Sequence, residues 1–586
     1  MDCLGGETDG LGERVLGWRS AGHFESVASR SIFVHSRDGA GPLGPQPMGG
    51  FPQEVSSRSA MSEPPDQEST LREDLAEVLE RRALTRDEAR PDAIERRHAA
   101  GGRTARENIA DLVDPGSFIE YGRFAIAAQR GRRELEDLIA RTPADGFIGG
   151  TARINGGLFG ERSACAVLSY DYTVLAGTQG AVGHRKKDRL FELIERMRLP
   201  TVFFAEGGGG RPGDTDYPVV SALDTRAFAL WARLSGMVPR IAVVAGRCFA
   251  GNAVIAGCSD LIVATENVSL GMGGPAMIEG GGLGKVEPDD IGPLEMQTGN
   301  GVVDIAVADE AEAVAVVKQL IAYFQGATPP ADAVDQRYLR GLVPERGRRA
   351  YAVQPIVETL CDEKSVSFLR ERFAPEMVTA LGRIDGRPLG LIANNTMHMA
   401  GAITSNGADK ASRFMQLCDA FGLPLISLVD TPGMMVGPDA EATALVRHTS
   451  RLLVTGAALR VPLIAVILRR GYGLGAQAMV AGSLHEPLLT VAWPTAHLGP
   501  MGLEGAVKLG LRKELEAIAD DSERERRIRE LTAAAEQNAK ALNAATLFEL
   551  DDVIDPAETR ACISSTLGAV ATAPEPVPGR SFVDTW

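Results

Sequence analysis

The sequence lacks a CxxC pair, a long apolar run and an excess of positive charge. Its seven cysteines are scattered, which argues against a zinc ribbon, and we expect no metal site. An odd, scattered set of cysteines is typical of a reducing compartment and predicts a cytoplasmic location. No apolar run could cross a bilayer, and the N-terminus has no apolar signal-peptide core. The net charge of −16 argues against nucleic-acid and anionic-membrane partners.

Side-chain nucleophiles and nucleotide-binding loops also have little support. There is no GxSxG elbow, and His448 and His497 are more simply explained by packing or hydrogen bonding than by base catalysis. The glycines at 207–210 precede Arg211 but lack the lysine and serine of a P-loop. The glycine-rich stretch 271–284 is typical of a mobile surface loop.

The composition predicts a globular chain with an atypical N-terminus. A length of 586 residues with 44% hydrophobic residues is consistent with two or more domains. Residues 1–60 have no periodic apolar pattern, so we expect them to be disordered or a non-native extension, because Met61 opens a segment that looks like a natural start. A charged helix is predicted over 70–82.

Apolar runs alternate with helical stretches from about residue 145 onward. This alternation predicts βα units and a largely parallel sheet, and therefore an α/β fold. The predicted strands are 200–205, 241–245, 425–429 and 462–468, and the predicted helices are 227–235 and 522–545.

Two stretches of the chain match at a nearly fixed offset. Gly177, Lys186 and Arg189 pair with Gly401, Lys410 and Arg413 at an offset of 224 residues, and the offset becomes 223 from residues 238–239 onward. Ordered matches over this distance predict an internal duplication. The alternative is that the matching glycines and prolines reflect the shared chemistry of βα turns.

Two glycine-rich turns occupy equivalent positions in this repeat. Residues 249–254 and 472–477 each follow a predicted strand and open a predicted helix. Small residues allow close approach of the backbone, and free N–H groups at such a turn can hold an oxyanion. Strand-to-helix packing is the alternative for either turn alone, whereas the pairing of the two favours the functional interpretation.

Basic residues accompany both copies of the repeat. Lys186 with Arg189, and Lys410 with Arg413, lie in the helix that follows each early glycine. They could contact phosphates or could form a solvated helix face, and the sequence leaves both interpretations open.

Several segments together resemble the carboxyltransferase (β) subunits of biotin-dependent acyl-CoA carboxylases. The most specific are 102–120 (GRTARENIADLVDPGSFIE), 383–387 (RIDGR), 410–414 (KASRF), 418–421 (CDAF), 429–433 (VDTPG), 492–496 (AWPTA) and 551–560 (DDVIDPAETR). The resemblance extends from about residue 75 to 570. Residues 121–130 and 143–147 look more like the carboxyltransferase part of single-chain long-chain acyl-CoA carboxylases.

The resemblance implies two tandem domains of the ClpP/crotonase superfamily, related by duplication. The expected boundaries are 61–340 for the acyl-CoA side and 341–575 for the biotin side. The family usually forms homohexamers, and its sites use two backbone oxyanion holes to transfer a carboxyl group from carboxybiotin to the α-carbon of an acyl-CoA. No Ala-Met-Lys-Met biotinylation motif occurs, so a partner biotin carboxylase and biotin carrier (α) subunit is implied.

Position by position, the resemblance gives each turn a role. The N–H groups of Gly251 and Asn252 are expected to hold the thioester oxygen, and those of Leu474 and Gly475 the biotin ureido oxygen. The residues expected to bind cofactor or substrate are Arg211, Lys186, Arg189, Tyr472 and Gln477.

The sequence departs from the family pattern at both turns. Neither turn reads Gly-Gly-Ala, and Gln477 replaces the aspartate found in many propionyl-CoA carboxylases, so the acyl chain stays open. A biotin-dependent decarboxylase or transcarboxylase subunit shares these motifs. The sequence also leaves open a crotonase-type enoyl-CoA hydratase or isomerase and a non-catalytic assembly subunit.

Overall fold

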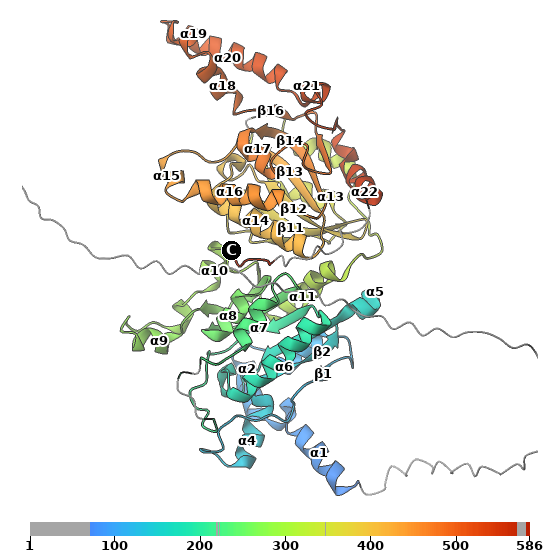
Figure 1. Cartoon of the computed structure of the whole chain (residues 1–586), viewed down its shortest axis with the longest axis vertical. Coiled ribbons are helices and arrows are strands. Elements are labelled where there is room, and N and C mark those ends of the chain that lie inside the picture. The colour runs from blue at the N-terminus through green and yellow to red at the C-terminus, as the bar shows by residue number, and fades with distance from the viewer. Residues whose placement is uncertain (1–70, 218–220, 222, 346, 348, 571–581) are drawn as a thin grey trace, which may run out of the picture. The chain divides into compact units, whose positions relative to one another are not determined.

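Two β-sheets form the framework of the computed structural model, which describes residues 71–217, 221, 223–345, 347, 349–570 and 582–586 (Figure 1). The first sheet has the strand order β1-β2-β3-β4-β5-β7-β9. The second has the order β10-β11-β12-β13-β14-β15-β17, with β16 paired to β14, and β6 pairs with β8 separately. The segment 1–60, predicted to be disordered or non-native, lies outside the described residues.

The strands of the first half are β1 Ile119–Glu120, β2 Phe147–Arg153, β3 Ala164–Tyr170, β4 Thr201–Phe204, β5 Arg240–Val244, β6 Arg247–Phe249, β7 Leu261–Thr265, β8 Ser269–Gly271 and β9 Ile305–Val307. Those of the second half are β10 Ser367–Leu369, β11 Met377–Ile384, β12 Arg387–Asn394, β13 Leu425–Thr431, β14 Leu463–Tyr472, β15 Leu489–Ala492, β16 His497–Gly499 and β17 Asp552–Val553.

The helices up to residue 325 are α1 Glu73–Ala83, α2 Pro91–Ala99, α3 Ala105–Leu112, α4 Leu135–Arg141, α5 Gly156–Phe159, α6 Ala181–Met197, α7 Ala227–Arg233, α8 Gly251–Gly257, α9 Pro275–Gly280, α10 Leu294–Gly299 and α11 Glu310–Gln325. The later helices are α12 Leu339–Leu342, α13 Gln354–Leu360, α14 Ser405–Ala420, α15 Pro438–Glu441, α16 Leu445–Ala457, α17 Gly473–Met479, α18 Leu503–Gly510, α19 Arg512–Glu516, α20 Asp521–Asn538, α21 Ala541–Thr546 and α22 Thr559–Ala569.

The predicted βα alternation is confirmed, and the sheets are largely parallel. β3, β4, β5, β7 and β9 run parallel in the first sheet, as do β12 through β15 in the second. β2 with β3 and β11 with β12 are antiparallel pairs at equivalent places, which the sequence did not predict. Only a short connection separates the strands of each pair, too short for the helical crossover that parallel pairing needs.

The repeat predicted from the sequence has matching backbone detail in the two halves. Gly177 and Gly401 both have positive φ, at 62° and 78°, and each ends a short 3₁₀ turn (Leu175–Gly177 and Met399–Gly401). A Cβ on either glycine would lie within 3 Å of a backbone oxygen, that of Glu206 or Asp430. These two acids are themselves repeat partners, so the duplication extends to individual contacts. The domain boundaries at 340 and 341 stay a prediction.

Buried apolar side chains link the halves as well as filling each. One core cluster lies under the first sheet, around Phe203 and Trp231, and another lies under the second, around Val466 and Trp493. A third cluster combines residues of both halves. Polar contacts reinforce this junction: Arg370 pairs with Asp304 at 2.9 Å, and the Arg413 guanidinium donates to the carbonyl of Asp260.

Two predicted segments differ in detail from the structure. The helix predicted over 522–545 is two helices, because α20 ends at Asn538 and α21 begins at Ala541. The expected loop 271–284 contains a short helix, α9, which begins at Pro275. No helix in the part of the chain that the structure describes is long and apolar enough to cross a membrane.

Candidate active site

The first glycine-rich turn connects β6 to α8 through a strained residue. Ala250 has φ 51° and ψ −123°, and its N–H donates to the carbonyl of Gly271 on β8 at 3.2 Å. This backbone conformation directs the chain sharply into α8. Within the described residues, the N–H groups of Gly251 and Asn252 have no hydrogen-bond acceptor. Two adjacent backbone donors are therefore free to bind an oxygen atom.

The side chain of Asn252 fastens this turn to the loops around it. It is fully buried and accepts hydrogen bonds from Gln179 Nε2 at 3.0 Å and from the Gly209 N–H at 3.1 Å. Its Nδ2 donates to the carbonyls of Gly177 and Glu206, both at 3.3 Å. Asn252 therefore uses all its main hydrogen-bonding capacity to hold the turn, while its backbone N–H stays free.

The second turn connects β14 to α17 and depends on backbone proximity. Gly473 has φ 60°, and a Cβ on Gly475 would lie 2.6 Å from the carbonyl carbon of Gly433. Leu474 is 64% exposed, whereas Gly475 is buried. As in the first turn, the N–H groups of Leu474 and Gly475 have no acceptor among the described residues. The two turns thus offer equivalent donor pairs.

A cavity of about 680 Å³ opens beside the second turn. Leu474 and Gln477 lie in its wall, together with His485, Leu498 and Glu549. This volume lies in the ordinary range for small-molecule sites, about 300–1,000 Å³. The cavity therefore gives the Leu474–Gly475 donor pair a space in which a ligand can lie.

Tyr472 and His497 line a neighbouring cavity of about 600 Å³ rather than that one. Burial raises the pKa of Tyr472 to about 12, with Arg470 opposing the shift. The phenol is thus a neutral hydrogen-bonding group at physiological pH. His448, the other histidine considered from the sequence, instead pairs with Asp409 at 2.7 Å.

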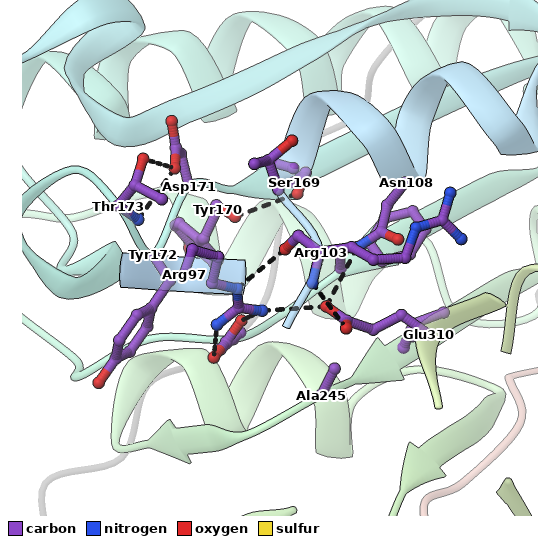
Figure 2. A pocket seen from close by; sticks show the side chains of 15 residues that line it. Arg97, Arg103, Asn108, Ser169, Tyr170, Asp171, Tyr172, Thr173, Ala245 and Glu310 are labelled. Carbon is purple, nitrogen blue, oxygen red and sulfur yellow. Dashed lines mark hydrogen bonds and ion pairs between the residues drawn. The ribbon is translucent and has the colours of Figure 1, made fainter. Parts of the chain in front are cut away.

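A buried acid–arginine cluster is linked to the first turn through Glu206, whose carbonyl accepts from Asn252 Nδ2. Arg97 donates two hydrogen bonds of 2.8 Å to the Glu206 carboxylate and one of 3.0 Å to Glu310. Figure 2 shows the Arg97 guanidinium directed toward Glu310, with its Nε on the carbonyl of Arg103. The cavity here is only about 20 Å³, roughly the space of one water. The cluster therefore anchors structure rather than binding a ligand.

Two opposing effects determine the pKa of Glu206 in this cluster. Burial raises the pKa of Glu206 to about 7, and the charge of Arg97 opposes that rise. Gly246, which follows β5, is packed directly on this carboxylate, since a Cβ there would lie 2.5 Å from Glu206 Oε1. The position of the chain entering the first turn thus depends on Glu206.

The second half has its own version of this cluster at the repeat-equivalent acid. Asp430 accepts from Arg469 Nε at 2.9 Å, Arg470 Nε at 2.6 Å and the Tyr351 hydroxyl at 2.8 Å. Because Arg469 and Arg470 belong to β14, just before Tyr472, the carboxylate fixes the end of the strand that leads into the second turn.

The three basic residues expected at the phosphates have different environments. Lys186 is buried, and its ammonium donates to the carbonyls of Ala144, at 2.9 Å, and Phe147. Arg211 is also buried and pairs with Asp145. Both cations are therefore already paired with protein groups, and their role at a phosphate stays a prediction. Arg189 is exposed on α6, unlike the other two.

The roles of Lys186 and Lys410 explain why this lysine occurs in both repeats. Lys410 Nζ donates to the carbonyls of Arg370 and Phe373, both at 2.8 Å, as Lys186 does to the matching loop of the first half. Carbonyl oxygens in such loops need a donor when they are buried. The lysine thus has the same structural role in both repeats, which is to donate hydrogen bonds to buried loop carbonyls.

Two polar residues near the first turn, Gln179 and Lys187, were not predicted from the sequence. Gln179 lies beside Gly251, with its Nε2 2.8 Å from where a Cβ on that glycine would be. Lys187 Nζ donates to Gln179 Oε1 at 2.5 Å. One signal in the sequence could have indicated them. The equivalent residues of the second repeat, Ile403 and Ala411, are apolar, so the polar residues occur in the first repeat alone.

Comparison with known proteins gives a consistent result over most of the chain. Residues 96–582 match the family model described as the carboxyl transferase domain. The chain is 31% identical to the methylmalonyl-CoA carboxyltransferase 12S subunit of Propionibacterium freudenreichii subsp. shermanii, over 87% of this chain and 97% of that protein. It is 30% identical to the biotin-dependent long chain acyl-coenzyme A carboxylase beta4 subunit of Mycobacterium tuberculosis, over 85% and 94%.

Solved structures resemble the chain in the same way. A single-chain, multi-domain long-chain acyl-CoA carboxylase is 56% identical with a TM-score of 0.81, covering 85% of this chain. The chain spans about half, 49%, of that longer chain. The transcarboxylase 12S hexamer, with methylmalonyl-coenzyme A and methylmalonic acid bound, is 29% identical with a TM-score of 0.75, covering 88% and 99% of the two chains.

Proposed function

The chain belongs to the carboxyl transferase family, and we propose that it transfers a carboxyl group from carboxybiotin on a partner protein to the α-carbon of an acyl-CoA. The observation that carries this proposal is the pair of turns with free N–H groups, Gly251 with Asn252 and Leu474 with Gly475. The expected fold, two tandem crotonase-like domains, is confirmed by the match to the 12S structure.

In this proposal the first turn stabilises the charge that develops on the substrate. Loss of the α-proton turns the thioester into an enolate, whose oxygen accepts from the N–H groups of Gly251 and Asn252. A single preorganised donor of this kind contributes about 3 kcal/mol to transition-state stabilisation. No side-chain nucleophile is needed, because the enolate carbon itself attacks CO₂.

The residues around the second turn fit a biotin ring. The N–H groups of Leu474 and Gly475 would hold the ureido oxygen, and the adjacent cavity of about 680 Å³ has room for the bicyclic ring. When bound, carboxybiotin supplies the CO₂ and the base for the α-proton. Gln477 and Leu474 line the cavity and would orient the ring. Tyr472, which directly precedes this turn, lines the adjoining cavity.

We propose a long-chain acyl-CoA as the substrate. The 56% identity to a long-chain acyl-CoA carboxylase exceeds the 31% found for the 12S subunit, and the beta4 subunit, at 30%, is also named as part of a long-chain enzyme. Exposed apolar side chains also follow β8, which is bonded to Ala250 of the first turn: Met272, Met277 and Leu283 are 63–78% exposed. Flexible methionines suit a variable alkyl chain.

We propose the same assembly for this chain as for its relatives. We propose a homohexamer, on the similarity to the 12S hexamer, and a separate biotin carboxylase and biotin carrier (α) subunit as partner. Of the basic residues expected to bind substrate, Arg189 is exposed, and we propose it as a contact for the phosphates of CoA. A cytoplasmic location is proposed, since the six described cysteines are free thiols.

A transcarboxylase role is the second candidate, favoured by the near-complete coverage of the 12S subunit. In that case the carboxyl group would come from a second carboxylated metabolite, through biotin, without ATP or bicarbonate.

The test is an acyl-CoA panel, from acetyl-CoA to palmitoyl-CoA, with the purified chain and its biotinylated partner. The proposal predicts carboxylation that requires ATP and bicarbonate and is fastest with long chains. Carboxylation fastest with short chains would overturn the substrate assignment. Transfer that needs neither ATP nor bicarbonate would favour the transcarboxylase role instead.

A further inference from the structure

Four buried polar side chains form a continuous hydrogen-bonded chain that ends at the first turn. Lys187 of α6 donates to the Tyr170 hydroxyl at 3.0 Å and to Gln179 Oε1 at 2.5 Å. Gln179 Nε2 then donates to Asn252 Oδ1 at 3.0 Å. All four side chains have at most 5% of their surface exposed. The chain therefore runs through the protein interior from α6 to the backbone of the proposed thioester site.

The direction of these hydrogen bonds is fixed by the lysine. An ammonium group has only donors, so Gln179 must present its carbonyl oxygen to Lys187 and its NH₂ group to Asn252. Asn252 must then accept through Oδ1 and donate through Nδ2. The amide dipoles thus align head to tail, and each bond polarises the next. Without Lys187, only the bond to Asn252 Oδ1 would hold the Gln179 amide in this orientation.

The burial of Lys187 is energetically unfavourable. The lysine is fully buried in the aromatic core under the first sheet, and no carboxylate is among its hydrogen-bond partners. Burial lowers its pKa to about 7, so part of its charge is retained at neutral pH. An apolar residue would serve the core better. A buried cation with a perturbed pKa beside a proposed site is a candidate for a functional role.

The fold itself does not need this chain, because the second half lacks it. Gln179 and Ile403 form equivalent backbone bridges, to Gly210 and Met434 respectively, at the repeat offset. The counterpart of Lys187 on α14 is Ala411, which is also fully buried. The same supersecondary structure therefore forms with apolar residues at both positions.

The chain also ends directly against the turn. Gln179 Nε2 lies 2.8 Å from the position of a Cβ on Gly251, and Asn252 belongs to the turn itself. The polar chain is thus confined to the half that is proposed to hold the thioester. At the second turn the equivalent of Asn252 is Gly475, which has no side chain to receive such a bond.

We propose that Lys187 and Gln179 are positioning residues for the acyl-CoA site. Through Asn252 they hold the N–H groups of Gly251 and Asn252 in line with the thioester oxygen, and they direct positive potential toward that oxygen as it becomes an enolate. This inference rests on the proposed function. It adds a lysine–amide support whose counterpart positions in the second half are Ala411 and Ile403.

The test uses three variants of the full chain: Gln179→Leu, Lys187→Met and the double variant. Each is assayed with its biotinylated partner and the best acyl-CoA of the panel, and kcat, KM and the thermal midpoint are measured. The double variant replaces both polar partners with apolar side chains, a change that can be nearly neutral for stability. The Tyr170 hydroxyl loses its partner in both Lys187 variants, and the thermal midpoint shows whether the protein stays folded.

We expect kcat to fall about tenfold in the double variant, less than the hundredfold or larger loss caused by removing an oxyanion donor itself. KM should change little, since the groups act on the transition state. The losses in the two single variants should not multiply in the double variant, because both break the same chain. Ile403→Leu, at the position equivalent to Gln179, is the matched control and should keep kcat within about twofold, as volume-conserving apolar changes usually do.

Two outcomes would overturn the inference in distinguishable ways. An active wild type with an equally active, folded double variant would overturn the positioning role alone. An assembled wild-type complex that carboxylates no acyl-CoA would overturn the proposed function and this inference with it.

Discussion

The substitution Gly475→Ala is the sharpest available perturbation of the second turn. An added Cβ would lie 2.6 Å from the carbonyl carbon of Gly433 and 2.7 Å from its Cα. Carbon atoms in comfortable contact are about 3.5 Å apart or more. Because both obstructing atoms are backbone, no side chain can turn away, and the turn must move by about 1 Å.

A displacement of that size should be costly for catalysis. Misplacement of a reacting geometry by about 1 Å can lower a rate a hundredfold. We therefore expect Gly475→Ala to reduce carboxyl transfer about a hundredfold while the protein still assembles. Gly251→Ala should cost less, since its Cβ meets the ends of the Gln179 and Phe228 side chains, at 2.8 and 2.9 Å, and these can shift.

The assay is steady-state carboxylation by the reconstituted complex, with circular dichroism and gel filtration as checks on folding and assembly. Gly510→Ala, at the end of α18, is the matched control, because nothing lies within 4 Å of its Cβ position. A folded Gly475→Ala protein with wild-type activity would refute the assignment of the second turn.

Three further predictions concern the first turn and the buried charges. Gly251→Val should abolish measurable transfer without unfolding the chain, because the branched side chain crowds the thioester position; retained activity would count against that placement. Arg97→Met should lower the free energy of unfolding by about 3–5 kcal/mol, since it removes the cation that Glu206 and Glu310 share in the interior; chemical denaturation measures this, and an unchanged midpoint would contradict the ion pair. Burial lowers the pKa of Lys410 to about 7, whereas lysine in an unfolded chain titrates at about 10.4. Between these values the unfolded chain holds a proton that the folded chain has released, so stability rises with pH, by up to about 1.4 kcal/mol per pH unit. Relative to Lys410→Met, the thermal midpoint of wild type should therefore increase from about pH 7 to pH 10, and a constant difference would contradict the shift.

The sequence was sufficient to predict the architecture and the two turns. Periodic apolar runs located β4, β5, β13 and β14 within a few residues, and the repeat offset paired Gly177 with Gly401, whose positive φ values now explain why both are glycine. The strands depend on local sequence patterns, and the glycine pair is one local turn that occurs in both repeats. They can be read from one sequence because turn geometry restricts the residue type.

Features that depend on tertiary neighbours could not be predicted in the same way. The sequence does not show that loop carbonyls and Asp145 surround Lys186 and Arg211. Lys187 looks like one more charged residue on a helix, although it is fully buried. Which face of α6 is covered depends on the packing of α6 onto the sheet, and a charged side chain gives no sequence signal of that burial.

The unusual composition of the first turn now has a physical reason. The family pattern has glycine where this chain has Asn252. Its side chain occupies a buried position among the loops at 177, 206 and 209 and leaves the backbone N–H free. The departure from the usual pattern thus changes how the turn is supported, and the donors themselves remain.

The most direct test of carboxyl transfer needs only the purified chain, a malonyl-type CoA and free biotin. Run in reverse, the reaction moves the carboxyl group from the CoA thioester to biotin, and decay of carboxybiotin releases CO₂. The proposed function predicts CO₂ release that depends on both biotin and the CoA substrate and is lost in Gly475→Ala. A folded, assembled chain that releases no CO₂ from any carboxylated acyl-CoA would contradict it.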